Sequence, residues 1–110
     1  MAKYLILGTY TLDGAREVLR EGGIVTRDRF LENVRNIGGR VEAFYYAFGE
    51  TDLYTIVDLP DNVSVAALAM GLSTGGTVKM TTVVLITPEE TELIKAKVPL
   101  VRSHHPKNIS

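Results

Sequence analysis

The sequence predicts one α+β domain, in which a four-stranded antiparallel sheet carries its helices on one face. Three observations lead to this prediction. Strand-like and helical segments alternate along the chain and end on a strand followed by a last helix. Both faces of the predicted strands are largely apolar. The chain has 110 residues, which is enough for one hydrophobic core and too few for two.

The first strand is followed by a helical region that glycine divides in two. Residues 3–11 are rich in β-formers. A short helix is predicted over residues 15–19, and a second from about residue 26 to residue 37, where the apolar positions follow helical spacing. The pair Gly22-Gly23 lies between them and predicts a break.

A β-hairpin and a third helix are predicted next. The aromatic segment 40–48 and the segment 53–59 are predicted strands, joined by a turn that contains glycine. Pro60 ends the second of these strands. Residues 63–73 then form a helix that is apolar almost all round, so more than one of its sides is expected to be covered.

The last strand and the last helix are the clearest of the local predictions. Residues 77–86 are rich in β-branched side chains. The sequence Thr-Pro-Glu-Glu at 87–90 has the pattern of a capping box with proline at the first helical position. Two lysines stand in the last turn of this helix, where the helix dipole favours cations, and Pro99 ends it.

The order of elements is therefore β-α-β-β-α-β with a terminal helix, which is the ferredoxin-like arrangement. Both crossovers are expected to be right-handed and to place their helices on the same face of the sheet. We expect one domain over residues 1–98 and a C-terminal tail or arm over residues 99–110.

The apolar character of both sheet faces predicts self-association. A chain this short can cover one face with helices, and an apolar second face of this kind marks an interface. We expect a homodimer or higher homo-oligomer that packs sheet against sheet and leaves a lined cavity between the sheets. In the strand over residues 41–48, the alternation places four residues on one face: Val41, Ala43, Tyr45 and Ala47.

Three stretches resemble the GYD domain family of small bacterial and archaeal proteins. They are KYLILGTYTLDGAR, EGGIVTRDRFLENVRNIGGRVEAFYYAFGETDLYTIVDLPDN and TTVVLITPEE, and the resemblance covers about residues 3–93. Gly49, Glu50 and Asp52 match the turn that names the family, and Thr51 stands where the family usually has tyrosine. The resemblance implies a ferredoxin-like fold similar to the dimeric α/β-barrel proteins. These include cofactor-free monooxygenases, lactone isomerases and haem enzymes, whereas the family itself has no agreed reaction.

The candidate site residues are carboxylates of one turn and tyrosines of the strands. Asp52, beside Glu50, is the candidate catalytic group, because paired carboxylates can transfer protons. The competing interpretation is that both residues only stabilise a tight turn. Side chains that could bind a ligand in an aromatic cavity are Tyr10, Tyr45, Tyr46, Glu50 and Tyr54. The competing interpretation for the tyrosines is core or interface packing.

Other candidate sites have weaker support. Arg27 and Arg29 follow the Gly22-Gly23 pair and could bind an anion, but no phosphate-binding motif is present, so a simple helix break is preferred. The only two histidines, His104 and His105, fall in the predicted tail. The chain has no cysteine. We therefore expect no metal and no cofactor, and haem in particular lacks a histidine ligand in the folded part.

Composition restricts the partners. Twelve basic and thirteen acidic residues leave a net charge of -1, which argues against binding to nucleic acid or to an anionic membrane surface. No apolar run approaches the roughly 20 residues that a membrane-spanning helix needs. The N-terminus lacks the pattern of a secretory signal, so we expect a cytoplasmic protein.

Two functions remain open. The first is an oligomeric module that binds a small, mostly apolar molecule between its sheets, or that serves in assembly or regulation. The alternative is a cofactor-free oxygenase or isomerase of the dimeric α/β-barrel type, with Asp52 or a tyrosine as the acid–base group. Charged residues inside the predicted strands, beyond the first residue of each, are few, namely Glu42, Asp58 and Lys79, and this favours the first function.

Overall fold

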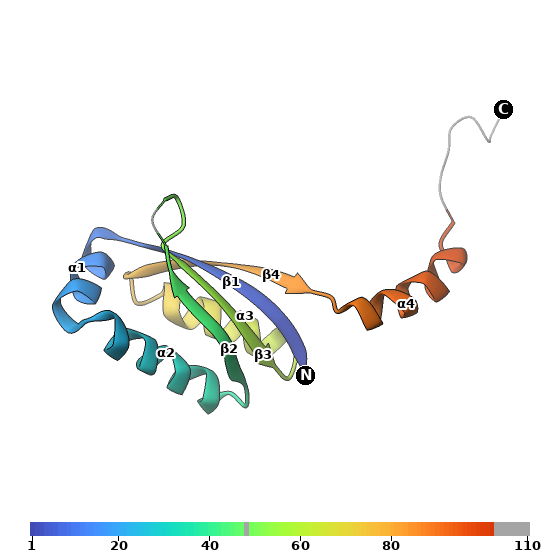
Figure 1. The fold of residues 1–110 in the computed structure, drawn as a ribbon, viewed down its shortest axis with the longest axis horizontal. Helices are drawn as coiled ribbons and strands as arrows, with labels where there is room; N and C mark the ends of the chain where they lie inside the picture. Colours follow the sequence, from blue (N-terminus) through green and yellow to red (C-terminus); the bar gives the residue numbers. More distant parts are fainter. Residues whose placement is uncertain (48, 103–110) are drawn as a thin grey trace.

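The computed structural model describes residues 1–47 and 49–102 and shows a four-stranded antiparallel sheet with a layer of helices (Figure 1). The strands are β1 (Ala2–Tyr10), β2 (Arg40–Tyr46), β3 (Leu53–Leu59) and β4 (Val78–Leu85). The helices are α1 (Leu12–Glu21), α2 (Gly23–Asn36), α3 (Asn62–Ser73) and α4 (Pro88–Lys97), and the 3-10 turn η1 (Val98–Leu100) follows. The strand order is β2-β3-β1-β4, which confirms the predicted ferredoxin-like α+β fold.

The broken helix is predicted correctly, but its two parts are longer than the pattern indicates. α1 begins at Leu12 because Thr11 caps it and accepts a hydrogen bond of 3.1 Å from the backbone N–H of Gly14. A single residue, Gly22, separates the two helices, although the sequence suggested the pair Gly22-Gly23. Gly22 has a φ of 94°, in the region that favours glycine, whereas Gly23 is already the first residue of α2.

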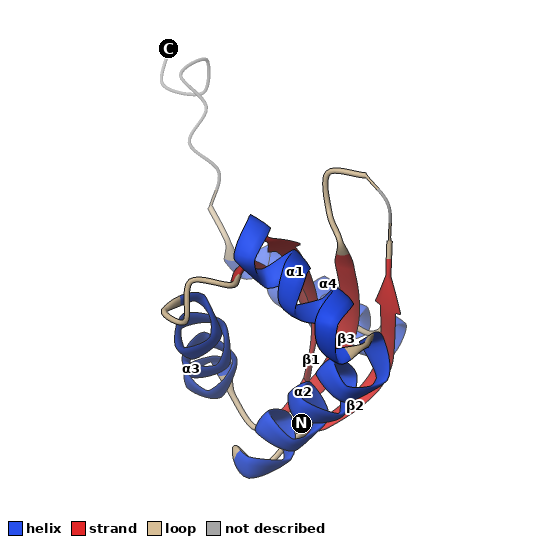
Figure 2. Ribbon diagram, turned by 90° about the vertical axis from the view of Figure 1, so that its left-hand side faces the viewer, coloured by secondary structure: helices blue, strands red, loops and turns tan. Residues whose placement is uncertain are grey.

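The hydrophobic core lies between the sheet and the helices α2 and α3. Its buried members are Tyr4 and Ile6 of β1, Val57 and Leu59 of β3, Phe30 and Val34 of α2, and Val65 and Leu68 of α3. α2 packs on β2 and α3 packs on β4, so the helix layer is divided between the two edges of the sheet (Figure 2). The prediction that the crossover helices share one face is therefore confirmed.

Because β2 contains a β-bulge, one residue, Val41, lies on the other face of the sheet from the one predicted. Val41 pairs with Val57, but Ala43 pairs with Ile56, so Glu42 is the extra residue of a bulge. Simple alternation places Val41 on the same face as Ala43, and this is wrong. The bulge shifts the alternation by one residue, and Val41 packs against the core under the helices.

The terminal helix α4 stands apart from the body of the domain (Figure 1). It has the predicted capping box, in which Thr87 and Glu90 exchange hydrogen bonds of 3.0 and 3.1 Å between side chain and backbone. None of its residues is buried. The radius of gyration is 18.1 Å, compared with about 13 Å for a compact chain of this length. The expected boundary at residue 98 stays a prediction, and both histidines lie outside the described residues.

Candidate functional site

A partly enclosed cavity of about 120 Å³ lies on the helix side of the sheet, under α1 and α2. Its apolar lining consists of Val18, Phe30, Phe44, Leu53, Leu72, Val78 and Met80. Its polar lining consists of Tyr10, Glu17, Thr26, Arg29, Asn33 and Thr77. A mostly apolar cavity with a few polar groups is the usual form of a small-molecule site.

One edge of the cavity depends on a close contact between α1 and the start of β4. The backbone N–H of Thr11 donates a 2.9 Å hydrogen bond to the carbonyl of Thr77. Gly14, which also lines the cavity, lies so close to Thr77 that a Cβ on Gly14 would be 1.8 Å from the same carbonyl oxygen. Glycine at position 14 therefore allows the helix to reach the strand.

Aromatic rings form one wall of the cavity. The rings of Phe30 and Phe44 have centroids 5.5 Å apart, and Phe44 meets Tyr46 edge-on at 5.2 Å. The hydroxyl of Tyr46 donates a 2.8 Å hydrogen bond to the carbonyl of Gly23, the first residue of α2. This bond ties the end of β2 to the helix that covers the cavity.

Tyr10 is the one predicted ligand residue that lines the cavity. Burial, with smaller contributions from the nearby Tyr46 and Asp52, raises the pKa of the Tyr10 phenol to about 12. The phenol is therefore protonated at neutral pH. It can donate a hydrogen bond to a bound molecule, but it is not poised to act as a base.

The two arginines after the helix break already have acidic partners. Arg29 pairs with Glu17 at 3.2 Å and also with Glu21, and these contacts, the Glu21 hydrogen bond first, raise the pKa of Arg29. Arg27 pairs with Asp28 at 2.9 Å. Since both guanidinium groups are paired, the arrangement favours the helix-break interpretation over an anion site.

The turn that contains Glu50 and Asp52 is hydrogen-bonded to the end of β1. A carboxylate oxygen of Asp52 accepts a 2.9 Å hydrogen bond from the backbone N–H of Tyr10, and the N–H of Asp52 donates to the carbonyl of Gly8. The carbonyl of Glu50 accepts from the Thr9 hydroxyl at 3.3 Å. Neither acidic residue lines the cavity. These contacts are those of turn chemistry.

The predicted ligand residues are therefore not brought together. Tyr10 lines the cavity and Tyr46 stands beside its aromatic wall, whereas Tyr45 and Tyr54 pair with each other on the opposite side of the sheet. The strand pattern alone could not separate these two pairs. It also missed the cavity residues that come from helices, although the helical spacing around Phe30 indicated a buried face there.

On the helix-free side of the sheet, the strand register defines three rows of side chains that cross all four strands. One row is Arg40, Asp58, Lys3 and Leu85. The next is Ala43, Ile56, Leu5 and Val83, and the third is Tyr45, Tyr54, Leu7 and Thr81. We call the second and third rows the apolar face. Tyr45 is 70% exposed there, and Tyr54 and Val83 are exposed as well.

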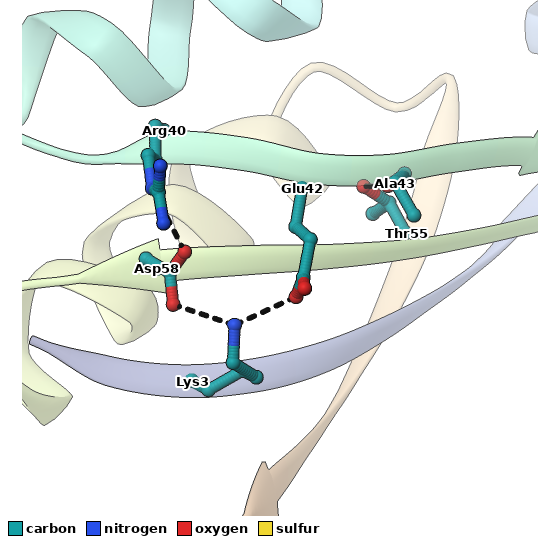
Figure 3. A network of polar contacts seen from close by, with 6 residues as sticks. All are labelled: Lys3, Arg40, Glu42, Ala43, Thr55 and Asp58. Atoms are coloured by element: carbon teal, nitrogen blue, oxygen red, sulfur yellow. Dashed lines mark hydrogen bonds and ion pairs between the residues drawn. The ribbon is translucent and has the colours of Figure 1, made fainter.

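Three residues of the first row, Arg40, Asp58 and Lys3, form a network of ion pairs that the bulge residue Glu42 joins (Figure 3). The ammonium of Lys3 donates to Glu42 at 2.6 Å and to Asp58 at 2.9 Å, and Arg40 donates to the other Asp58 oxygen at 3.1 Å. Asp58 is 6% exposed. The hydrogen bond from Lys3, followed by its charge and by Arg40, lowers the pKa of Asp58 and outweighs the opposing effect of burial.

This network predicts a loss of stability in acid. A carboxyl group whose pKa is lower in the folded state stabilises the fold above its unfolded pKa of about 3.9, and the contribution is lost as the pH falls through the folded value. We expect Asp58→Asn to lower the free energy of unfolding by roughly 1 kcal/mol at pH 7 and by much less at pH 2. Urea unfolding of both proteins at the two pH values measures this.

The exposed carboxylate Asp28 supplies the control for that measurement. Asp28 pairs with its neighbour Arg27 at the surface, and such pairs contribute little. Asp28→Asn is therefore expected to change the free energy of unfolding by less than about 0.5 kcal/mol. An equal loss in both variants, or a loss in Asp58→Asn that is the same at both pH values, would contradict the role of the network.

A comparison with known protein families gives a match over nearly the whole domain. A family model described as the GYD domain matches residues 4–94. No curated protein matches the chain. Within residues 1–47 and 49–102, no three His, Cys, Asp or Glu side chains gather as a possible metal site. None of the helices in that part of the chain is long and apolar enough to cross a membrane.

Proposed function

The chain belongs to the GYD domain family, and from that premise we propose that it is a homo-oligomeric module that binds a small, mostly apolar molecule in the cavity under α1 and α2. The cavity itself carries the proposal. An apolar cavity of about 150 Å³ in another protein takes up benzene. A cavity of about 120 Å³ with aromatic walls therefore suits a molecule built on one small ring.

The polar lining narrows the choice of ligand. The protonated phenol of Tyr10 offers a hydrogen-bond donor to a hydroxyl or carbonyl oxygen of the ligand. Arg29 is already paired with Glu17 and Glu21, so it offers no free positive charge to an anionic ligand. A simple phenol or a similar monocyclic compound has the required size and polarity.

The alternative of a cofactor-free oxygenase or isomerase has less support. Such chemistry needs a base within reach of the bound molecule. In the cavity, Tyr10 is held protonated and Glu17 is paired with Arg29. Asp52 lies outside the cavity lining and binds backbone N–H. These contacts favour binding without chemical change.

The apolar face supports self-association through the helix-free side of the sheet. The two rows of the apolar face are exposed or partly exposed in the single chain, with Tyr45, Tyr54 and Val83 the most exposed of their apolar and aromatic side chains, and the ion-pair row lies next to them at one end. A second copy that packs the same face would bury them, as an isologous twofold contact does. A ligand between the sheets stays a prediction, and the cavity on the helix side is formed within one chain.

The absence of cysteine supports a cytoplasmic setting.

The proposed ligand site can be tested with a substitution that fills the cavity. Val18 lines it, whereas its neighbour Leu19 is 85% exposed on the outer side of α1. We expect Val18→Phe to weaken the binding of p-cresol at least tenfold in isothermal titration calorimetry, and Leu19→Phe to leave it unchanged. Tyr10→Phe should remove the preference for p-cresol over toluene. Equal binding by the Val18→Phe and wild-type proteins would overturn the assignment of the cavity.

A further inference from the structure

We propose that the ligand cavity and a neighbouring groove between α2 and α3 form one binding site, which takes a para-alkylphenol with its ring in the cavity and its chain in the groove. This inference rests on the proposed function and deepens it, because it names the class of ligand. The cavity alone suits one small ring, whereas the cavity and the groove together suit a ring that carries a short apolar chain.

The groove lies between the facing sides of α2 and α3. Ile37 at the end of α2 and Leu68 of α3 give it an apolar lining, and the small residues Ala67 and Gly71 of α3 lie exposed at its rim. α2 packs on β2 and α3 packs on β4, at opposite edges of the sheet, so the two helices stand apart over the central strands (Figure 2). The groove is therefore open to solvent and accessible to a ligand.

Two residues join the groove to the cavity. Asn33 of α2 and Leu72 of α3 line both of them. Along α2, the residues that line the cavity end at Asn33, and those that line the groove begin there and end at Ile37. Four residues of a helix span about 6 Å, which is about the contour length of four carbon–carbon bonds. The groove therefore continues the cavity by the length of a butyl chain.

The position of Tyr10 determines which way the ring points. Val78, which lines the cavity, pairs with Tyr10 at the end of β1. Leu68, which lines the groove, belongs to the core cluster of Tyr4 and Ile6, nearer the start of β1. Tyr10 and the groove therefore lie at opposite ends of the cavity. A phenol whose oxygen accepts a hydrogen bond from Tyr10 directs its para substituent toward the groove, and its ortho substituents elsewhere.

Gly71 leaves the space that the chain would occupy. A Cβ at position 71 would meet no atom within 4 Å, so no other part of the described chain fills the groove beside it. An alkyl chain placed there would remove apolar surface from water on the ligand and on the groove at the same time. The lining offers no charged side chain, so it favours an alkyl chain over an ionised one.

Isothermal titration calorimetry with three phenols tests the shared site. 4-Butylphenol is expected to bind the wild type at least about tenfold more tightly than p-cresol, because its additional methylene groups leave water. 2-Butylphenol has the same atoms, but its chain does not point toward the groove, so it is expected to gain less than about threefold. The comparison of the two butylphenols separates the groove from a general preference for apolar molecules.

A substitution that fills the groove gives an independent test. Gly71 lines the groove and not the cavity. Gly71→Leu is therefore expected to bind p-cresol as the wild type does and to lose the gain for 4-butylphenol. Ala66→Leu is the matched control, because it adds the same side chain at an exposed position of α3 that lines neither the groove nor the cavity. This variant should keep the gain.

The outcomes distinguish this inference from the proposed function. If the wild type bound p-cresol but bound 4-butylphenol no more tightly, or if 2-butylphenol showed the same gain, the inference would be overturned and the cavity site would stand. A gain that persisted in Gly71→Leu would overturn it as well. If p-cresol did not bind the wild type, the proposed function would fail and this inference would fail with it.

Discussion

Gly14→Ala is expected to lower the free energy of unfolding by about 3 kcal/mol. The new Cβ would stand 1.8 Å from the carbonyl oxygen of Thr77 and 2.7 Å from its carbonyl carbon, and backbone atoms cannot move aside as a flexible side chain can. The start of α1 must therefore lift away from β4. This combines overpacking, which costs about 1–3 kcal/mol, with the loss of the Thr11–Thr77 hydrogen bond, about 1 kcal/mol.

Urea unfolding measures this loss, and Gly71→Ala supplies a control of opposite sign. Gly71 lies inside α3, and a Cβ there would meet no atom within 4 Å. Alanine restricts the unfolded chain and suits a helix, so this variant is expected to gain about 0.5–1 kcal/mol. If Gly14→Ala unfolded like the wild type, the close contact between α1 and β4 would be wrong. Because α1 covers the cavity, Gly14→Ala should also weaken p-cresol binding.

Val83→Arg is expected to raise the dissociation constant of the sheet-packed dimer at least 100-fold. Val83 lies opposite Leu5 in one of the two rows of the apolar face and is 42% exposed in the single chain. In a face-to-face contact the arginine would bury a charge without a partner, at a cost of several kcal/mol, and each 1.4 kcal/mol changes the constant tenfold. Sedimentation equilibrium over a range of concentrations measures the effect.

Leu19→Arg is the matched control for the dimer. It introduces the same side chain at an exposed apolar position of α1, away from the helix-free side of the sheet. This variant should keep the wild-type association. If the Val83→Arg assembly had the same mass as the wild-type assembly, the apolar face would not be the contact between copies. p-Cresol binding measured on the same sample would show separately whether the cavity is intact.

The caps and breaks of the helices were predictable because each depends on a few neighbouring residues. The Thr87 capping box forms as its sequence indicates, and Gly22 divides the first helical region. Even so, the observed ends of α1 and α2 differ from the predicted ends by up to three residues. The pattern shows apolar positions more clearly than it shows where the backbone hydrogen bonds of a helix begin.

The candidate site was predictable only in part. Tyr10 lines the cavity, but Tyr45 and Tyr54 lie on the other side of the sheet, and Asp52 binds the backbone of β1. Alternation along a strand divides its residues between two faces without showing which face the helices cover. In β2 the bulge at Glu42 changed even that division for Val41.

The sequence by itself determined the order of strands and helices, the positions of the turns and the excess of apolar strand residues, because these follow from periodicity and from contacts between near neighbours. Only the tertiary structure decided that Gly14 meets Thr77, that Lys3 joins Asp58, and that α1 and α2 leave a cavity over the sheet. Such contacts join residues tens of positions apart. Their geometry depends on how whole elements pack, which no local pattern of residues records.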